Sequence, residues 1–230
     1  MKATYNTLRS DIRNMATSGS NPIDFRIPDS QIDFWVDQTR SKLISQSIQK
    51  RKDITTVWVQ ILPCLELQHV DKSECCDLPS NCKVLRTVLQ IPRTVETSAD
   101  NCILKVTDSS GNIIPKTTEN GAKYDQYNKY TSNQTKWYEK NMYIYIINND
   151  TLSKINVHAI FESPMDLADY ESCTGETCFN DNDEYPCSLK MASEITDIVY
   201  KTKVIPFMTL PQDNSNDAAN ITTAPPTNKE

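Results

Sequence analysis

The period of the hydrophobic residues changes twice along this sequence, and this change constrains the fold more than any other feature. Up to about residue 54, apolar residues recur every three to four positions, as they do on one side of a helix. From Thr55 to about residue 163 they alternate with polar residues, as they do in strands. After Pro186 the helical spacing returns. This order predicts an α+β fold in which terminal helices flank a central antiparallel β insertion.

The predicted organisation has four parts. They are an N-terminal helical part (1–54), a β-rich insertion (55–187), a C-terminal helix (188–203) and an extended tail (204–230). Short helices are marginally stable alone, so the C-terminal helix is expected to pack on the N-terminal helices. The tail is rich in proline and polar residues and has no hydrophobic period, which predicts an extended segment.

The N-terminal part contains two predicted helices. The first covers residues 4–17, with a stripe formed by Tyr5, Leu8, Ile12 and Met15. The second covers residues 28–51. Its start carries Ser30 and Asp33 at the capping-box offset. Its second half and the residues after it are positively charged, which the helix dipole favours; these residues are Arg40, Lys42, Lys50, Arg51 and Lys52.

The second helix has apolar residues on more than one side. Trp35, Val36 and Leu43 are expected to pack against Ile195 and Val199 of the C-terminal helix. Other apolar residues point away from this stripe or widen it; they include Phe34, Ile44 and Ile48. The helix is therefore buried on two sides within its own domain, or it has one face on the core and another on a neighbouring subunit.

The C-terminal helix is predicted from its cap and its stripe. Ser188 is a suitable N-cap, and Ala192, Ile195 and Val199 share one face. We expect the helix to end before Pro206, because proline cannot continue the backbone hydrogen bonding of a helix.

The β insertion is predicted to contain strands within 55–70, 83–96 and 102–115, followed by a hairpin within 142–162. The sequence DSSGN, residues 108–112, is typical of a hairpin turn, and the Asn148–Thr151 region is expected to be the turn of the second hairpin. Residues 121–141, dense in Tyr and Asn, are expected to form a long surface excursion.

Eight cysteines occur in the sequence, and their state is open from the residues alone. The N-terminus lacks the apolar core of a signal peptide, so synthesis in a cytoplasm and mostly free thiols, dispensable for folding, are expected. Two loop-like clusters could still be pinned by a metal or by late oxidation. Their spacing matches no common zinc motif, so no metal site is predicted.

No motif in the sequence indicates catalysis. It contains no glycine-rich phosphate loop, no nucleophile elbow and no H-E-x-x-H, and the acidic run at 181–185 lacks the closing residues of a calcium loop. A pairing of Cys64 with His69 or His158 is conceivable. The sequence nevertheless predicts that the protein is not an enzyme and binds no cofactor. The net charge of -6 disfavours a nucleic-acid clamp, and no apolar run is long enough to span a membrane.

Two segments and the order of the elements resemble a known family. The segments are IPDSQIDFWVDQTRSKLI (27–44) and LPQDNSNDAAN (210–220). With the β insertion and the returning helix, they are similar to head-to-tail connector proteins of short-tailed bacteriophages, and most of all to the ring proteins beneath the portal in crAss-like phages. The resemblance implies a virion protein at the capsid–tail junction. It implies a homo-oligomeric ring, commonly of twelve copies, around a channel that passes genomic DNA without sequence-specific binding.

The same resemblance implies that the C-terminal tail binds the portal or a neighbouring ring or tail protein. The predicted subunit and ring interface comprises Phe34, Trp35, Ile48, Ile205, Phe207, Leu210, Asp213, Asn216 and Asp217. Two rival hypotheses remain at this point. One is a cysteine-stapled module for binding or receptor recognition, and the other is a small enzyme that uses a Cys–His pair.

Overall fold

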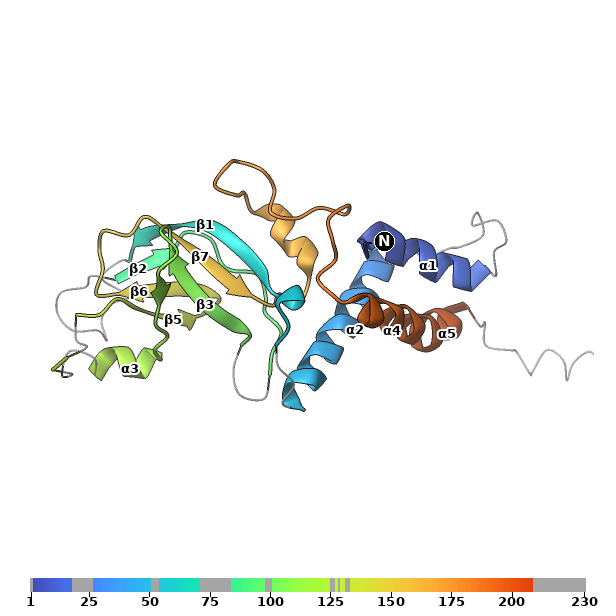
Figure 1. Cartoon of the computed structure of the whole chain (residues 1–230), viewed down its shortest axis with the longest axis horizontal. Coiled ribbons are helices and arrows are strands. Elements are labelled where there is room, and N and C mark those ends of the chain that lie inside the picture. The colour runs from blue at the N-terminus through green and yellow to red at the C-terminus, as the bar shows by residue number, and fades with distance from the viewer. Residues whose placement is uncertain are drawn as a thin grey trace, which may run out of the picture.

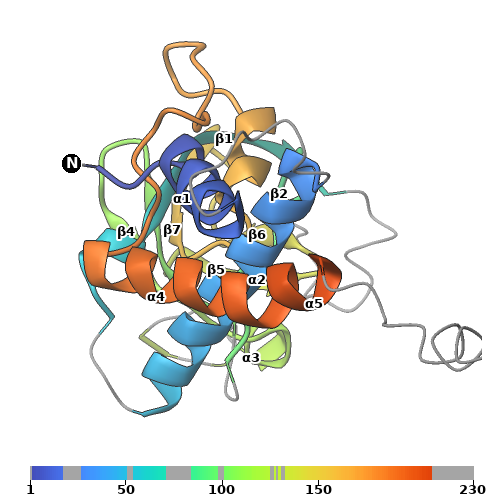
Figure 2. The same ribbon diagram turned by 90° about the vertical axis from the view of Figure 1, so that its right-hand side faces the viewer.

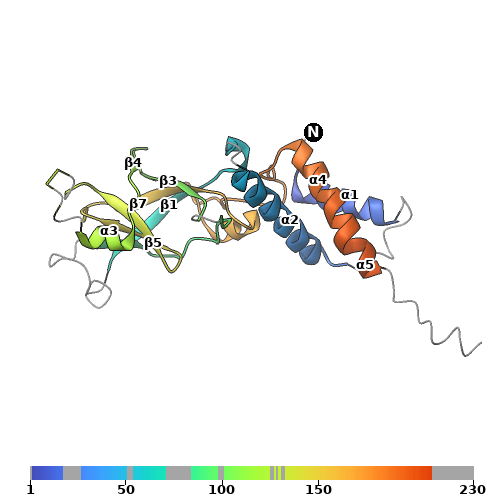
Figure 3. The same cartoon turned by 90° about the horizontal axis from the view of Figure 1, so that it is seen from below.

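A computed structural model of the chain describes residues 2–17, 27–50, 54–70, 84–97, 101–124, 127, 129–130 and 133–208. Figure 1 shows a β-sheet region at one end of an elongated molecule and a group of helices at the other. The view from below in Figure 3 shows the same separation. The predicted α+β class is confirmed. None of the described helices is long and apolar enough to cross a lipid bilayer.

The helical end is built around α2. Its helices are α1 (Tyr5–Thr17), α2 (Asp29–Gln49), α4 (Leu189–Val199) and α5 (Ile205–Met208). Both α1 and α4 contact α2, and Figure 2 shows α4 and α5 lying across it. The predicted C-terminal stripe is confirmed, because Ala192, Ile195 and Val199 are all buried. One core cluster joins residues of these helices to residues of the sheet.

The start of α4 agrees with the prediction from the sequence, whereas the start of α2 differs from it. Ser188 caps α4 as predicted, since its side chain accepts a hydrogen bond from the Met191 amide at 3.2 Å. The predicted capping box at Ser30 is wrong: Pro28 is the N-cap of α2, with no side-chain cap hydrogen bond. The Asp33 carboxylate is instead held by the Arg9 guanidinium of α1 through bonds of 2.6 and 2.7 Å.

The C-terminal helix continues past the point where we expected it to end. A π-helical segment, Tyr200–Val204, follows α4 and leads into α5, so the prediction of an extended tail is wrong for residues 204–208. Pro206 is the second residue of α5, within a helix that runs on from α4, so its missing amide interrupts the regular α-helical hydrogen bonding. The wider π turn before it supplies the local change in hydrogen bonding. Residues 209–230 lie outside the described part of the chain.

Seven strands form one antiparallel sheet. They are β1 (Gln60–His69), β2 (Val84–Thr87), β3 (Ile103–Asp108), β4 (Ile113–Ile114), β5 (Lys136–Lys140), β6 (Tyr143–Ile147) and β7 (Lys154–Ala159). Their order is β4-β3-β7-β1-β2-β6-β5. Short helical elements connect them: η2 (Thr56–Trp58) precedes β1, α3 (Glu119–Tyr124) precedes β5, and η4 (Pro164–Asp169) follows β7.

The two edge strands of this sheet are joined through the segment that follows β4. Lys116 forms a parallel bridge with Trp137 of β5. The Trp137 amide donates to the Pro115 carbonyl at 3.0 Å, and the Thr117 amide donates to the Trp137 carbonyl at 2.7 Å. The sheet therefore closes on itself, which satisfies the backbone groups that an open edge would expose.

The first predicted hairpin is confirmed, and its turn is held by one carboxylate. The Asp108 side chain accepts from the amides of Ser110 and Asn112, both at 2.9 Å. Gly111 has φ +88°, a conformation that favours glycine. This turn connects β3 to β4.

The second predicted hairpin is wrong. β6 pairs with β2 and β5, whereas β7 pairs with β1 and β3, so residues 148–153 cross between two halves of the sheet. The tight hairpin joins β5 to β6 instead, with Asn141 and Met142 both at positive φ, as a type I′ turn requires. β5 lies within residues 121–141, which we expected to be a surface excursion.

The cysteine prediction is corrected at two positions. Cys64 and Cys173 form a disulfide across 109 residues of sequence, with their Cα atoms 5.4 Å apart. Cys64 lies at an irregularity between Leu62 and Leu65 of β1, has φ +54°, and its amide donates to the Asn156 side chain. The thiols of Cys178 and Cys187 are free, as predicted. Cys75, Cys76 and Cys82 lie outside the described residues.

Peptide mapping is expected to recover Cys64 linked to Cys173. The full-length protein would be alkylated under denaturing, non-reducing conditions, digested and analysed by mass spectrometry. Reduction before alkylation should abolish the linked species, and Cys178 and Cys187 serve as unlinked internal controls. Recovery of Cys64 and Cys173 as singly alkylated thiols after purification without reductant contradicts the bond.

Candidate functional site

Arg40 of α2 joins the helical end to the β region. The side chain is fully buried and donates hydrogen bonds to three backbone carbonyls. These belong to Trp58 at 3.4 Å, Phe161 at 2.8 Å and Pro186 at 3.0 Å. The three acceptors stand just before β1, just after β7 and just before α4. One guanidinium therefore holds the points where the chain passes between the two regions.

Sequence reasoning missed this role, because it assigned Arg40 to the charged second half of the helix. A signal was present in the spacing. Arg40 lies four residues after Val36 and four before Ile44, both of which are buried, so the stripe passes through it. An arginine within an apolar stripe predicts a buried guanidinium with backbone acceptors.

Asp37 lies three residues before Arg40, on the same side of α2, and is also buried. One of its carboxylate oxygens accepts from the Tyr5 hydroxyl at 2.6 Å and from the Tyr185 hydroxyl at 2.8 Å. Burial raises the pKa of Asp37 to about 6, although the hydrogen bonds from both phenols act in the opposite direction. Burial, followed by the charge of Asp37, raises the pKa of both tyrosines. The phenols therefore remain protonated donors.

A second polar cluster ties three segments together at the helical end. Arg9 of α1 binds Asp33 of α2 and also Asp181, to which it donates at 2.9 and 3.2 Å. Asp181 is the first residue of the acidic run 181–185, which was compared above with a calcium loop. Its carboxylate forms this ion pair with Arg9. In the described ranges, no group of three or more His, Cys, Asp or Glu side chains is arranged to hold a metal ion.

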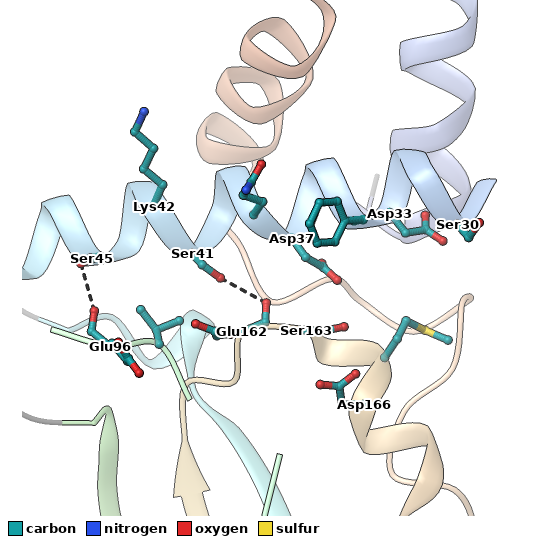
Figure 4. Close-up of a pocket in the computed structure, with 14 residues that line it drawn as sticks. Ser30, Asp33, Asp37, Ser41, Lys42, Ser45, Glu96, Glu162, Ser163 and Asp166 are labelled. Atoms are coloured by element: carbon teal, nitrogen blue, oxygen red, sulfur yellow. Dashed lines mark hydrogen bonds between the residues drawn. The ribbon is translucent and has the colours of Figure 1, made fainter. Parts of the chain in front are cut away.

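A groove of about 750 Å³ lies between α2 and the β region. One wall is α2 from Ser30 to Ser45, and the other is formed by residues 95–96 and 162–166. Two serines join the walls, since the Ser41 hydroxyl donates to the Glu162 carbonyl and the Ser45 hydroxyl to the Glu96 carbonyl. Figure 4 shows both bonds beneath α2.

The groove is acidic. Glu96, Glu162 and Asp166 line it, and the basic residue that lines it is Lys42. Burial and the charges of Glu96 and Asp166 raise the pKa of Glu162, while Arg93 lowers it. Burial also raises the pKa of Asp166. The carboxylates therefore repel one another across a partly desolvated surface.

The predicted interface residues lie in different surroundings. Phe34 is 58% exposed and lines the groove. Trp35 is only 8% exposed, and its ring packs edge-on against Phe207, with centroids 6.0 Å apart. Ile48 is half-buried against the core. Ile205 is 41% exposed and Phe207 59%. The remaining predicted residues lie outside the described part: Leu210, Asp213, Asn216 and Asp217.

The two-sided character of α2 is explained in part within this one chain. Trp35 and Val36 are buried at the helical end as expected, and Leu43 is half-buried at the edge of the core. The opposite side of α2 meets the β region through Ser41 and Ser45, while Arg40 reaches the β region from within the stripe itself. Phe34 alone among the predicted α2 residues is left largely exposed.

The Cys–His hypothesis loses one of its partners. Cys64 is bonded to Cys173, so it cannot supply a thiolate to His69 in this state. His158 lies in β7, where burial and the neighbouring Lys105 lower its pKa.

Comparison with known proteins identifies a family. The model of a crAss-like phage family described as "Phage tail ring protein 2" matches residues 7–222. The match therefore extends over both helical regions, the whole sheet and most of the tail. A search of curated proteins finds no match. A tail ring protein is a structural component of the virion. The chain belongs to the phage tail ring protein 2 family.

Proposed function

We propose that this protein assembles into a closed ring below the portal, connects the capsid to the tail and lines the channel through which genomic DNA passes. The observation that carries this proposal is the family match over residues 7–222. Twelve copies are proposed from the resemblance of the sequence to connector proteins.

Exposed apolar side chains at the helical end support assembly. Phe34, Ile205, Phe207 and Met208 are all exposed in the single chain. Clusters of exposed large apolar residues commonly mark protein interfaces. In a ring each copy contacts two neighbours through two different surfaces, and these side chains can supply one of them.

The net charge of -6 is compatible with a channel for DNA. Phosphates bind surfaces rich in Lys and Arg, and an acidic surface repels them. Such a channel would let DNA slide through without being retained.

The test is the assembly state of the full-length protein. Native mass spectrometry and negative-stain electron microscopy would be applied to the protein alone and after mixing with the portal protein of the same phage. Closed rings are expected in at least one condition, and their mass gives the copy number. A monomer that persists in both conditions overturns the proposed function.

The C-terminal tail is proposed to dock on the portal or on the next ring. Leu210, Asp213, Asn216 and Asp217 are the proposed contacts. Truncation after Met208 is the appropriate variant, because Val204 is fully buried and truncation after Lys203 would remove it from the core. The shortened protein is expected to fold with unchanged circular dichroism and to lose co-sedimentation with its neighbouring component. Normal joining by the truncated protein contradicts this role.

A further inference from the structure

We infer that the acidic groove beside α2 receives the basic and apolar end of the C-terminal helix from a second copy of this chain. This inference rests on the proposed function, because it names the two surfaces that meet in the ring. The donor segment is defined as residues 201–208, which comprise most of the π-helical segment and α5.

The groove and the donor segment are complementary in charge. Glu96, Glu162 and Asp166 line the groove. Lys201 and Lys203 lie in the turn before α5, and within its own chain Lys201 forms an exposed ion pair with Asp197 at 3.5 Å. Lysines brought to the groove would relieve the repulsion among its carboxylates, and complementary charge of this kind fixes the register of an interface.

The two surfaces are also complementary in hydrophobicity. Phe34 and Met165 supply apolar surface in the groove. Ile205, Phe207 and Met208 supply it on the donor segment, and all three are exposed. A segment with lysines followed by apolar side chains therefore matches a groove that has carboxylates beside a phenylalanine.

The donor segment of a chain does not fill that chain's own groove. In Figure 4 the lining carboxylates of the β region and the two serines lie on one side of α2, whereas Lys42 points to the other side, where the ribbon of α4 crosses. Figure 2 shows α5 continuing from α4 on that same outer side. Two complementary surfaces on opposite sides of one helix produce a heterologous contact, which propagates from copy to copy and closes into a ring when the rotation allows.

Zero-length cross-linking of wild-type rings tests the contact. Rings would be assembled, alone or on the portal, from an equal mixture of unlabelled and 15N-labelled full-length protein. A carbodiimide then couples lysine amines to carboxylates, and mixed-label peptides identify bonds between copies. Mixed-label peptides that join Lys201 or Lys203 to Glu96, Glu162 or Asp166 are expected. Rings whose cross-links between copies join other surfaces overturn the inference alone, whereas absence of rings in every condition overturns the proposed function as well.

A pair of substitutions provides a second readout. Phe34→Ala is expected to raise the concentration required for half-maximal ring formation about tenfold or more, because an apolar anchor at the centre of an interface is lost. Leu89→Ala, at an exposed position in the β region, is the matched control and should leave that concentration unchanged. Glu96→Lys and Lys201→Glu should each weaken assembly, and the double variant should recover it. Failure of the double variant to recover assembly, with Phe34→Ala equal to wild type, contradicts the contact.

Discussion

Replacing Arg40 by alanine is expected to lower the free energy of unfolding by about 3–5 kcal/mol. The substitution removes a buried charged donor and leaves the carbonyls of Trp58, Phe161 and Pro186 without it. Each buried acceptor that loses its partner costs about 1–3 kcal/mol and the cavity adds to this, while removal of the buried charge also removes its desolvation cost, which offsets part of the sum. Urea denaturation followed by circular dichroism would measure the change, at concentrations where wild type and variant are both monomeric.

Matched variants separate the hydrogen bonds from packing and from surface charge. Arg40→Met keeps much of the side-chain volume, so a loss close to that of alanine assigns the effect to hydrogen bonding. Arg13→Ala removes a partly exposed arginine that pairs with Asp29 and is expected to cost less than about 1 kcal/mol. An Arg40→Ala protein within about 0.5 kcal/mol of wild type contradicts the role assigned to this side chain.

The stability of the protein is expected to increase as the pH falls from 7 towards 4, through the protonation of Asp37. Burial raises the pKa of this carboxyl from 3.8 in the unfolded chain to about 6 in the fold. Because the folded pKa is the higher one, the folded state binds the proton more tightly. The resulting stabilisation is fully present below about pH 4 and is lost as the pH rises through about 6. A shift of this size corresponds to about 3 kcal/mol.

The contribution of Asp37 is isolated by comparing variants across this pH range. Asp37→Asn keeps an oxygen that can accept from Tyr5 and Tyr185, so its unfolding free energy should lack the Asp37 component between pH 4 and 7. Tyr5→Phe removes one of the donors that favour the carboxylate, and it should therefore shift the transition to higher pH. Identical pH profiles for wild type and Asp37→Asn contradict the assignment.

The local elements of this fold could be predicted from the sequence where the signals were themselves local. The stripes of α1 and α4, the Ser188 cap and the DSSGN turn each depend on residues within a few positions of one another. Two local rules failed because other interactions dominated. Asp33 is bound by Arg9 instead of capping α2. Pro206 is accommodated because a π-helical segment precedes it.

The features that sequence reasoning missed depend on contacts between distant residues. β6 and β7 have a turn between them, yet each pairs elsewhere because the sheet order places them in different halves. The Cys64–Cys173 bond spans 109 residues, a distance that spacing rules do not address. At the candidate site, Phe34 and Phe207 were predicted as interface residues. The carboxylates of the groove were not, since they come from segments about 50 to 130 residues apart that only the fold brings together.

The closure of the sheet has a consequence for a protein that must be made in many identical copies. In the described part of the chain, β4 is paired with β3, and β5 is bonded on both sides, to β6 and to residues 115–117. When newly folded copies meet at high concentration, β5 therefore offers no free edge with which a strand of another copy could pair. Strand exchange and fibre growth compete with ordered assembly in proteins that leave such edges open. Because the β5 edge is occupied within each copy, recognition at this place is left to side chains, whose chemistry can be specific.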